Sequence, residues 1–305
     1  MKGFRIAITG ATGFVGAATL DRALKAGFSV NALTRRKQPS RRGVTWVAGS
    51  LDDQASLDRM VRTADAVLHI AGVVNARDRA GFEEGNALGT MRVVDAARKA
   101  GVRRFVHVSS LAAREPSLSS YGWSKELAER YVKASGLDWT IVRPPAIYGP
   151  GDRDILDLFR MAKRGIMLLP PGGSLSIIAV EDLAELLLTL VLDQEESRAQ
   201  VYEVDDGTKG GFTHDSFGRA IGRAVGKQVR CIAAPRWLLD AAAWMDGTIR
   251  RDKAKLTPDR VNYYCHPDWV SNPMKAVPPQ LWTPQVFAAE GLASTARAYR
   301  AKGWL

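Results

Sequence analysis

The sequence predicts an α/β protein with a doubly wound parallel sheet and a smaller C-terminal lobe. Three observations predict it: short β-branched runs alternate with helical stretches in the first half, most of these runs are apolar on both faces, and a glycine-rich turn joins the first run to the first helix. A parallel sheet covered by crossover helices buries both of its surfaces, which explains the doubly apolar strands. The length of 305 residues allows two domains, or one large domain with an appended lobe.

The first half of the chain has the order β-α-β-α-β-α-β-α-β. Five segments have the pattern of strands: Phe4–Thr9, Phe28–Leu33, Ala66–Ile70, Arg103–Val108 and Asp138–Val142. Four segments between them carry apolar residues at helical spacing: Phe14–Ala26, Asp53–Thr63, Phe82–Ala100 and Tyr121–Ala134. A glycine follows three of these helices, as is typical where a helix ends.

Composition excludes several classes of protein. Apolar residues make up 46% and charged residues 25% of the chain, which is typical of a globular protein and excludes extensive disorder. The longest nearly uncharged apolar stretch, Leu186–Leu192, is far shorter than the roughly 20 residues of a membrane-spanning helix. We recognise no targeting segment and expect the protein to work in the cytoplasm.

The net charge of +11 favours an anionic partner without identifying it. Nucleic acid, acidic lipid and a phosphorylated cofactor all carry the required charge, but no interleaving of aromatic and basic residues indicates a nucleic-acid surface. We expect no metal site, because the cysteines and histidines lack the close spacing of metal ligands. These residues are Cys231, Cys265, His69, His107, His214 and His266.

The first predicted strand runs directly into a glycine-rich turn and then into a helix. The turn has the spacing G-x-x-G-x-x-G and comprises Gly10, Ala11, Thr12, Gly13, Phe14, Val15 and Gly16. Glycine lets the backbone approach a diphosphate closely, and the helix N-terminus offers unpaired N–H groups and a partial positive charge. A tight turn without a ligand is the alternative, but the flanking strand and helix are those of a Rossmann dinucleotide site.

The residues after the second strand indicate which dinucleotide binds. A carboxylate at this position binds the ribose 2′-hydroxyl of NAD, whereas arginine accommodates the 2′-phosphate of NADP. The chain has Arg35, Arg36 and Lys37 here, followed by Arg41 and Arg42, with no acidic residue between them. We therefore expect NADP(H) in preference to NAD(H), the alternative being a solvated basic loop.

Tyr121 and Lys125 begin the fourth predicted helix and lie four residues apart, so they share one face. A nearby ammonium ion stabilises phenolate and lowers the pKa of the phenol towards neutrality. Ser110 ends the preceding strand, 11 residues before the tyrosine, where the carboxyl ends of parallel strands line a ligand crevice. Tyr121 is therefore our candidate for the acid that protonates a carbonyl oxygen, and Ser110 for the group that polarises the oxygen.

These residues resemble the extended branch of the short-chain dehydrogenase/reductases, and the resemblance extends from Phe4 to about Val204. It rests on six motifs in order: Thr9-Gly10-x-x-Gly13-x-x-Gly16, His69-Ile70-Ala71-Gly72, Asn86-x-x-Gly89-Thr90, Ser109-Ser110, Tyr121-x-x-x-Lys125 and the run from Arg143 to Gly151. The chain departs from the family at Ser50-Leu51, where the family often has Asp before Leu at the adenine. The gap between Ser110 and Tyr121 resembles that of the family's ketone and aldehyde reductases more than that of its sugar-nucleotide epimerases.

The resemblance implies a seven-stranded cofactor sheet, with Tyr121 as general acid/base and Ser110 orienting the substrate. It also implies that Lys125 holds the nicotinamide ribose and that further residues line the cofactor. These are Ser50 and Leu51 at the adenine, Ala71, Gly72 and Asn86 in the cleft, and Pro144 and Ile147 at the nicotinamide carboxamide.

After Pro144-Pro145 the pattern becomes less regular, with Gly-Pro turns, a strand-like Leu175–Val180, a helix Glu181–Leu192 and a strand Gln200–Val204. We expect residues 1–148 and 174–205 to form the NADP-binding Rossmann domain, and 149–173 and 206–305 the substrate-binding lobe. Trp237, Trp244 and Trp269 are either walls of the substrate site or core of this lobe.

The sequence thus predicts an NADP(H)-dependent oxidoreductase that transfers hydride between nicotinamide and a carbonyl or secondary alcohol. One alternative is a sugar-nucleotide epimerase or dehydratase that holds its NAD(P) tightly. Another is a non-catalytic NADPH-binding module, in which Tyr121 would have no chemical role. The resemblance also implies a homodimer with a small-molecule substrate.

Overall fold

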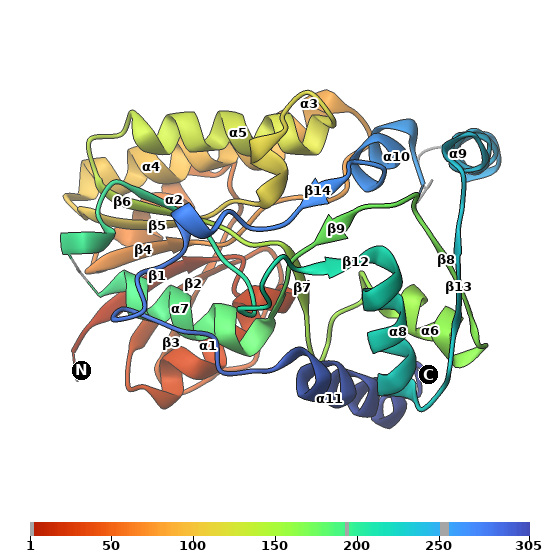
Figure 1. Cartoon of the computed structure of the whole chain (residues 1–305). Coiled ribbons are helices and arrows are strands. Elements are labelled where there is room, and N and C mark those ends of the chain that lie inside the picture. The colour runs from red at the N-terminus through yellow and green to blue at the C-terminus, as the bar shows by residue number, and fades with distance from the viewer. Residues whose placement is uncertain (1–2, 193–194, 251–255) are drawn as a thin grey trace. The chain divides into compact units, whose positions relative to one another are not determined.

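The chain forms two compact units in the computed structural model, which describes residues 3–192, 195–250 and 256–305 (Figure 1). The first unit comprises Met1–Arg143, Leu183–Glu203 and Val277–Trp282. The second comprises Pro144–Asp182, Val204–Ala276 and Thr283–Leu305.

A seven-stranded sheet forms the centre of the first unit. Its strands are β1 (Arg5–Thr9), β2 (Ser29–Thr34), β3 (Val44–Ala48), β4 (Ala66–His69), β5 (Arg104–Val108), β6 (Asp138–Arg143) and β11 (Gln200–Glu203). They lie in the order β3-β2-β1-β4-β5-β6-β11, and every neighbouring pair is parallel. The chain winds outward in both directions from β1 and β4, so the predicted doubly wound sheet is confirmed.

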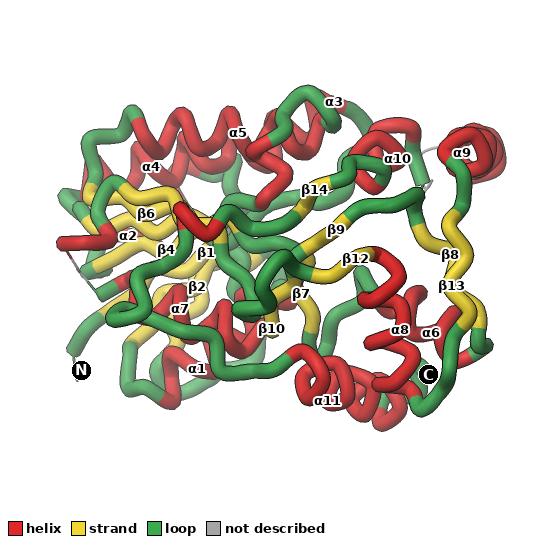
Figure 2. The backbone as a smooth tube through the Cα atoms, viewed as in Figure 1, coloured by secondary structure: helices red, strands yellow, loops and turns green. Residues whose placement is uncertain are grey.

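Helices cover both faces of this sheet (Figure 2). One face carries α1 (Phe14–Lys25) and most of α7 (Val180–Val191), and the other carries α2 (Gln54–Val61), α4 (Gly89–Ala100) and α5 (Ser120–Lys133). Val67, Phe105 and Ile141 project from three central strands into one fully buried apolar cluster. Burial on both faces is the physical reason for the nearly continuous apolar runs of these strands.

The observed elements differ from the predicted ones in three places. Strand β3 was not predicted, and its partly exposed side chains show it to be an edge strand without a continuous apolar run. The helix expected over Phe82–Ala100 begins earlier, with α3 (Arg79–Phe82), and contains a π-helical segment, Glu83–Leu88, before α4.

The third difference lies in the second unit, where the single strand expected over Leu175–Val180 is two strands. These are β9 (Ser174–Leu175) and β10 (Ile177–Ala179), which belong to different sheets. The buried Ser176 between them donates to Asp205 at 2.9 Å and accepts from the Ser271 N–H at 3.1 Å. The Ser176 N–H also donates to the Trp269 carbonyl oxygen at 3.0 Å, so both its backbone and its side chain are hydrogen-bonded between the two strands.

Three helices enclose the core of the second unit: α6 (Leu156–Lys163), α8 (His214–Val225) and α11 (Ala288–Ala301). Its short sheets pair β7 (Ala146–Tyr148) with β10, β9 with β12 (Phe212–Thr213) and β14 (Asp268–Trp269), and β8 (Ile166–Leu169) with β13 (Arg230–Ala233). Helices α9 (Arg236–Arg250) and α10 (Pro258–Tyr264) complete it. Tyr148, Phe159 and Tyr299 are its largest fully buried side chains.

The two units differ in their bounds from the domains expected from the sequence. Residues 144–148, 174–182 and 204–205 lie in the second unit, and 277–282 lie in the first. The assignment of cofactor binding to one part and substrate binding to the other stays a prediction. Of the three tryptophans considered for the lobe, Trp269 is buried and stacks on Tyr263, whereas Trp237 and Trp244 are both 70% exposed and are not core.

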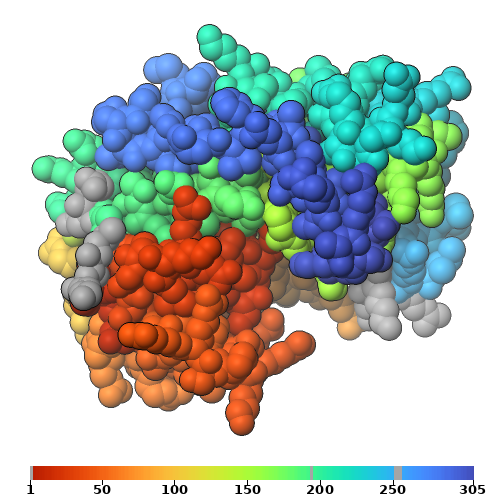
Figure 3. Space-filling model, turned by 90° about the horizontal axis from the view of Figure 1, so that it is seen from below, coloured from red at the N-terminus to blue at the C-terminus, as the bar shows by residue number. Residues whose placement is uncertain are grey.

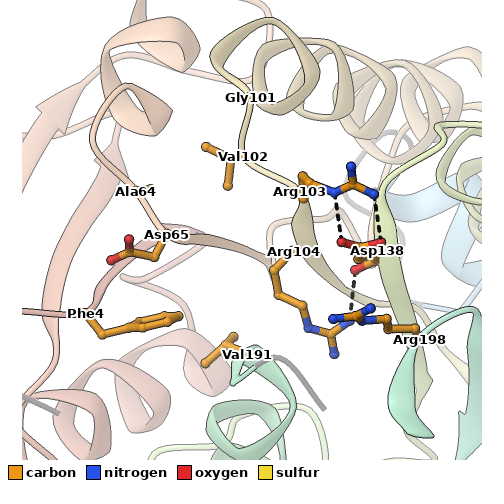
Figure 4. A pocket seen from close by; sticks show the side chains of 10 residues that line it. All are labelled: Phe4, Ala64, Asp65, Gly101, Val102, Arg103, Arg104, Asp138, Val191 and Arg198. Atoms are coloured by element: carbon orange, nitrogen blue, oxygen red, sulfur yellow. Dashed lines mark hydrogen bonds and ion pairs between the residues drawn. The ribbon is translucent and has the colours of Figure 1, made fainter. Parts of the chain in front are cut away.

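No helix in the described part of the chain combines the length and the apolar composition needed to cross a bilayer. A cavity of about 530 Å³ lies at the amino ends of β1, β4, β5 and β6 in the first unit (Figure 4). This edge of the sheet is opposite to the carboxyl ends that carry the glycine-rich turn. We therefore do not assign the cavity to the cofactor.

Arg104 lies in the wall of this cavity and is buried. Its guanidinium donates to the carbonyl oxygens of Leu190 and Asp138, and to the hydroxyl oxygens of Thr140 and Ser197 at 2.7 and 3.0 Å. One charged group thereby joins β5, β6, α7 and the turn before β11. Its neighbour Arg103 makes an exposed ion pair with Asp138.

We expect Arg104→Ala to destabilise the protein by about 3 kcal/mol or more, because it leaves several buried acceptors without a donor. Urea unfolding followed by circular dichroism measures the change. The neighbouring substitution Arg103→Ala is the control and should change stability by less than about 1 kcal/mol. Equal effects of the two substitutions would contradict this account.

Candidate active site

Two glycines shape the turn between β1 and α1. Gly10 has φ +76°, and a Cβ atom there would lie 2.7 Å from the Ala71 nitrogen. A Cβ atom on Gly16 would lie 2.0 Å from the Gly10 carbonyl oxygen. Neither position accepts a larger residue without moving backbone, so glycine lets the turn pack against both the end of β4 and the first turn of α1.

The N-terminus of α1 has the features of an anion site. Gly13 is the N-cap and provides no capping side chain, and the first turn contains no acidic residue. Thr12 and Gly13 are exposed, and Phe14 and Val15 are partly exposed. The free N–H groups and the helix dipole can therefore reach a bound phosphate, and this cradle fits the diphosphate of a dinucleotide.

The turn after β2 presents two arginines. The Thr34 hydroxyl donates to the Arg36 carbonyl oxygen at 2.7 Å and accepts from the Arg36 N–H at 3.3 Å, which fixes the turn. The side chains of Arg35 and Arg36 are exposed, and orange-red side chains of this part of the first unit stand out from the surface in Figure 3. Arg41 instead pairs with Asp21 of α1 at 2.7 Å.

His69, at the end of β4, is neutral and links three elements. The Thr90 hydroxyl donates to the Asn86 carbonyl oxygen at 2.6 Å, so it accepts from His69 Nε2–H at 2.9 Å. His69 Nδ1 then accepts from the Thr9 hydroxyl at 2.6 Å, while the Thr9 oxygen accepts from the Ala71 N–H at 3.2 Å. Burial lowers the pKa of His69 to about 3, and the nearby Lys125 ammonium contributes to this lowering, consistent with this tautomer.

Asn86 extends the same network to α5 from the π-helical segment Glu83–Leu88. Its amide donates to the Val73 carbonyl oxygen at 3.0 Å and to Ser124 Oγ at 2.9 Å, and its Oδ1 accepts from the Val73 N–H at 2.7 Å. Ser124 donates in turn to the Tyr121 carbonyl oxygen at 2.8 Å. A Cβ atom on Gly72 would lie 2.9 Å from Asn86 Oδ1, so only glycine lets this backbone pass so closely.

Lys125 is a buried ammonium ion. Its side chain comes from α5, and Nζ donates to the Val108 carbonyl oxygen at 2.8 Å, at the end of β5. A Cβ atom on Gly72 would lie 3.7 Å from Nζ, which places the ammonium group beside the end of β4. Burial lowers the pKa of Lys125 to about 8, opposed by the charge of Glu129 one turn along the helix. The group is therefore mostly charged at neutral pH.

The first turn of α5 packs closely on the segment that follows Ser110. Ser119 caps the helix by accepting from the Gly122 N–H at 3.0 Å, and a Cβ atom on Gly122 would lie 2.6 Å from the Ala112 carbonyl oxygen. The Ala112 N–H donates to Ser110 Oγ at 3.2 Å, so the serine oxygen is held and its O–H remains able to donate. The Tyr121 ring packs on Phe82 at 6.1 Å between centroids.

Tyr121 and Lys125 lie four residues apart in the regular helix α5, as predicted, and therefore on one face. The first unit brings Gly10, Ala71, Gly72, Asn86 and Lys125 together, which the short distances above establish. Leu51 packs against Gly89, and Ser50 donates to Asp52. Pro144 and Ile147 belong to the second unit. The cofactor contacts of these four residues stay predictions.

Sequence reasoning missed a buried ionic network behind the serine pair. Arg143 donates to both carboxylate oxygens of Glu129, at 2.7 and 2.8 Å, and reaches Glu203 at 3.3 Å. Ser109 also donates to Glu129, at 2.7 Å. Burial raises the pKa of Glu129, but Arg143, Ser109 and Lys133 together hold it below its usual value. One sequence signal could have indicated Glu129: it follows Lys125 by four residues and so lies on the same face of the helix.

Thr9 and Thr90 belong to the motifs that carry the resemblance, but their part in this network, and that of Ser124, was not predicted, since a hydroxyl gives no sequence pattern that distinguishes a network from a cap. In the part of the chain that the structure describes, no three His, Cys, Asp or Glu residues form a potential metal site, and Cys231 and Cys265 are unpaired.

Known proteins are similar to this chain in sequence and in fold. A family model described as NAD(P)H-binding matches residues 10–194. Ceramide reductase of Caulobacter vibrioides is 35% identical over 98% of this chain and 96% of that protein. UDP-glucose 4-epimerase of Vibrio cholerae is 27% identical over 78% of this chain and 79% of that protein. The structure of Thermus thermophilus UDP-glucose 4-epimerase in complex with NAD matches with a TM-score of 0.70, at 23% identity, over 97% of this chain and 99% of that one.

The sheet order, the glycine turn and these relatives define an NAD(P)-dependent oxidoreductase with a Rossmann fold. More specifically, the chain belongs to the NAD(P)H-binding extended short-chain dehydrogenase/reductases, the family of the NAD-dependent epimerases and dehydratases.

His107 of β5 is a buried polar group in this unit that the network does not use. It pairs with His69 on the neighbouring strand, and their rings stack at 5.3 Å between centroids. Neither of its ring nitrogens has a hydrogen-bond partner among the described residues. Burial holds the pKa of His107 well below its ordinary value, and the charge of Lys125 lowers it further.

A buried neutral histidine makes stability depend on pH. The unfolded chain takes up a proton as the pH falls below about 6.5, whereas folded His107 does not, so acid favours unfolding. We expect His107→Phe to be at least as stable as wild type at pH 7 and to lose about 2 kcal/mol less between pH 7 and pH 5. Urea unfolding at both pH values tests this. His266→Phe is the control, and a His107→Phe variant with the wild-type pH slope would contradict it.

Proposed function

We propose that this protein is an NADP(H)-dependent reductase that converts a carbonyl into a secondary alcohol, with Tyr121 as the general acid. The observation that carries the proposal is the buried Lys125 ammonium ion, one turn after Tyr121 and beside the strand end that packs on the glycine turn. Burying a cation is unfavourable unless it is hydrogen-bonded and its charge is compensated, as happens here through the Val108 carbonyl oxygen and Glu129. A charged group at this place favours phenolate over phenol.

Tyr121 is proposed to donate its phenolic proton to the carbonyl oxygen of the substrate. A free phenol titrates near pH 10 and is a poor acid at neutral pH, whereas an adjacent fixed cation brings its pKa closer to the working pH. The amide of Asn86 and the Ser124 hydroxyl hold the start of α5 through the Tyr121 carbonyl oxygen. The tyrosine is thus attached to a fixed part of the helix.

Ser110 is proposed to donate a hydrogen bond to the same carbonyl oxygen. Its oxygen already accepts from the Ala112 N–H, so its proton is the group left to offer a ligand. A fixed donor at an oxygen that gains negative charge stabilises the transition state more than the ground state. Removing such a donor costs roughly 3 kcal/mol in comparable sites.

NADP(H) is proposed as the cofactor, and when bound it supplies or takes the hydride. The α1 N-terminus would hold the diphosphate, and Arg35 and Arg36 would hold the 2′-phosphate. Neither arginine makes an ion pair with another described residue, and both are exposed after a turn that Thr34 fixes. Ala71, Gly72, Asn86 and Lys125 would line the nicotinamide half.

We propose a ceramide-like lipid carbonyl as the substrate class. Ceramide reductase matches almost the whole chain, including the second unit, whereas the UDP-glucose epimerase matches about three quarters of it. We also propose that this protein is cytoplasmic, where NADPH is available. Its proposed assembly is a homodimer. Sedimentation and cell fractionation test these two points.

The second candidate is a sugar-nucleotide epimerase that keeps its cofactor and returns the hydride. The match to UDP-glucose 4-epimerases favours it as an alternative. A carbonyl panel containing a keto-lipid, a soluble ketone and an aldehyde separates the two functions, because a reductase consumes NADPH stoichiometrically. Interconversion of UDP-sugars without net NADPH consumption would support the epimerase instead.

Tyr121→Phe should lower the rate of NADPH-dependent carbonyl reduction by at least about 100-fold, because the variant has no proton to donate. NADPH binding, measured by its fluorescence, should change little. Tyr131→Phe on the same helix is the control and should retain wild-type rates. Unchanged activity of Tyr121→Phe would disprove the assigned role and would favour a binding module without chemistry.

The double variant Arg35→Ala, Arg36→Ala should bind NADPH at least about tenfold more weakly, because two charged donors to phosphate are lost. Its affinity for NADH should stay the same. Titration of both cofactors measures the ratio. Arg42→Ala controls for the general loss of positive charge, and a parallel loss of NADPH and NADH affinity would contradict the 2′-phosphate contact.

A further inference from the structure

Large exposed apolar side chains gather at one edge of the second unit. Of the twelve such residues in the described part of the chain, eight lie on β8, β13 and α9. We call this set the α9 patch: Ile166, Leu168, Ile232, Trp237, Leu238, Trp244, Met245 and Ile249. Isolated exposed apolar residues are ordinary, but a group of this size on three successive elements of one unit indicates an interaction surface.

Helix α9 presents its apolar side to solvent. Trp237, Ala241, Trp244 and Thr248 follow one another at helical spacing, and Leu238, Met245 and Ile249 form the adjacent row. All seven of these side chains are exposed. The one buried residue among the described residues of the helix is Ala243, and the helix packs on α10. The helix is seen end-on in Figure 1.

The strands next to this helix continue the patch. Helix α9 begins three residues after β13 ends, and β13 pairs with β8 in the register Arg230 to Ile166 and Ile232 to Leu168. Paired residues lie on one face of a sheet, so these four exposed side chains point the same way. Met167 and Leu169 point to the other face, into the core of the second unit.

Basic residues lie on and beside the two strands of the patch. Residues 163–169 and 227–233 contain four cations and no carboxylate: Lys163, Arg164, Lys227 and Arg230, all exposed. The two carboxylates of α9, Asp240 and Asp246, already pair with Arg236 and Arg250. The edge of the second unit thus combines an apolar centre that contains two tryptophans with an excess of positive charge.

We propose that the α9 patch docks this protein on the surface of an anionic lipid bilayer. Tryptophan is enriched where apolar and aqueous layers meet, and lysine and arginine bind anionic headgroups. A second copy of the chain fits less well, because a two-fold contact through this patch would place its cations against the same cations of the partner. The proposal rests on this surface and not on the proposed reductase reaction.

The test uses the full-length protein without substrate, in co-sedimentation with vesicles of equal parts phosphatidylglycerol and phosphatidylcholine. We expect binding to these vesicles, much weaker binding to pure phosphatidylcholine, and release by added salt. The variant Trp237→Ser, Trp244→Ser should bind the mixed vesicles at least about tenfold more weakly. An unchanged circular dichroism spectrum and urea-unfolding midpoint of this variant would show that the chain is folded.

A matched control replaces two exposed apolar residues outside the patch, Met274→Ser and Phe287→Ser. This control should bind vesicles as wild type does. Equal binding by both double variants, or no binding of the wild type to anionic vesicles, would overturn the proposal. A wild-type dimer that the tryptophan variant converts to monomer, measured by analytical ultracentrifugation, would assign the patch to a second copy. Failure of the reductase proposal would leave the vesicle-binding and sedimentation measurements unaffected.

Discussion

A buried ammonium ion is the constraint on which the candidate site depends. Lys125 is 4% exposed, and its charge lies at the carboxyl ends of β4 and β5 in the first unit. Charge in such a place must be compensated, and the structure compensates it through the Val108 carbonyl oxygen and the Glu129 carboxylate. The surrounding histidines are held neutral, so they add no second positive charge.

Two polar networks hold helix α5, which carries this ion, through Ser124 and Glu129. The first runs from Thr9 through His69, Thr90 and Asn86 to Ser124, and so joins β1 and β4 to α5. The second joins Glu129 to the strand that contains Arg143. Because buried polar groups are unfavourable unless they are all paired, such networks make one geometry much more stable than its alternatives. Together the two networks position three parts of the first unit relative to one another: the glycine-rich turn after β1, helix α5 with Tyr121, and the end of β5 with Ser110.

The sequence was sufficient for the sheet and for the residues proposed to carry chemistry, but not for what supports them. The doubly apolar strands and the glycine spacing predicted the fold, because both follow from local rules of burial and backbone conformation. Strand β3 was not predicted, because an edge strand needs no continuous apolar run. The pairing of Glu129 with Arg143 was not predicted either, because it is a tertiary contact and a charged residue on a helix is ordinarily a surface residue.

The tryptophans show a related limit of sequence-based prediction: apolar side chains at helical spacing can be exposed. A sequence rich in tryptophan indicates buried aromatic residues, and for Trp269, stacked on Tyr263, this interpretation holds. Trp237 and Trp244 have the helical spacing of a core face, yet the structure leaves that face in solvent and buries the side with alanine. Spacing alone cannot distinguish a face that packs on protein from one that packs on another phase, because both require apolar residues at the same period. The cations on and beside β8 and β13 make that distinction, since a protein core excludes them and an anionic bilayer attracts them.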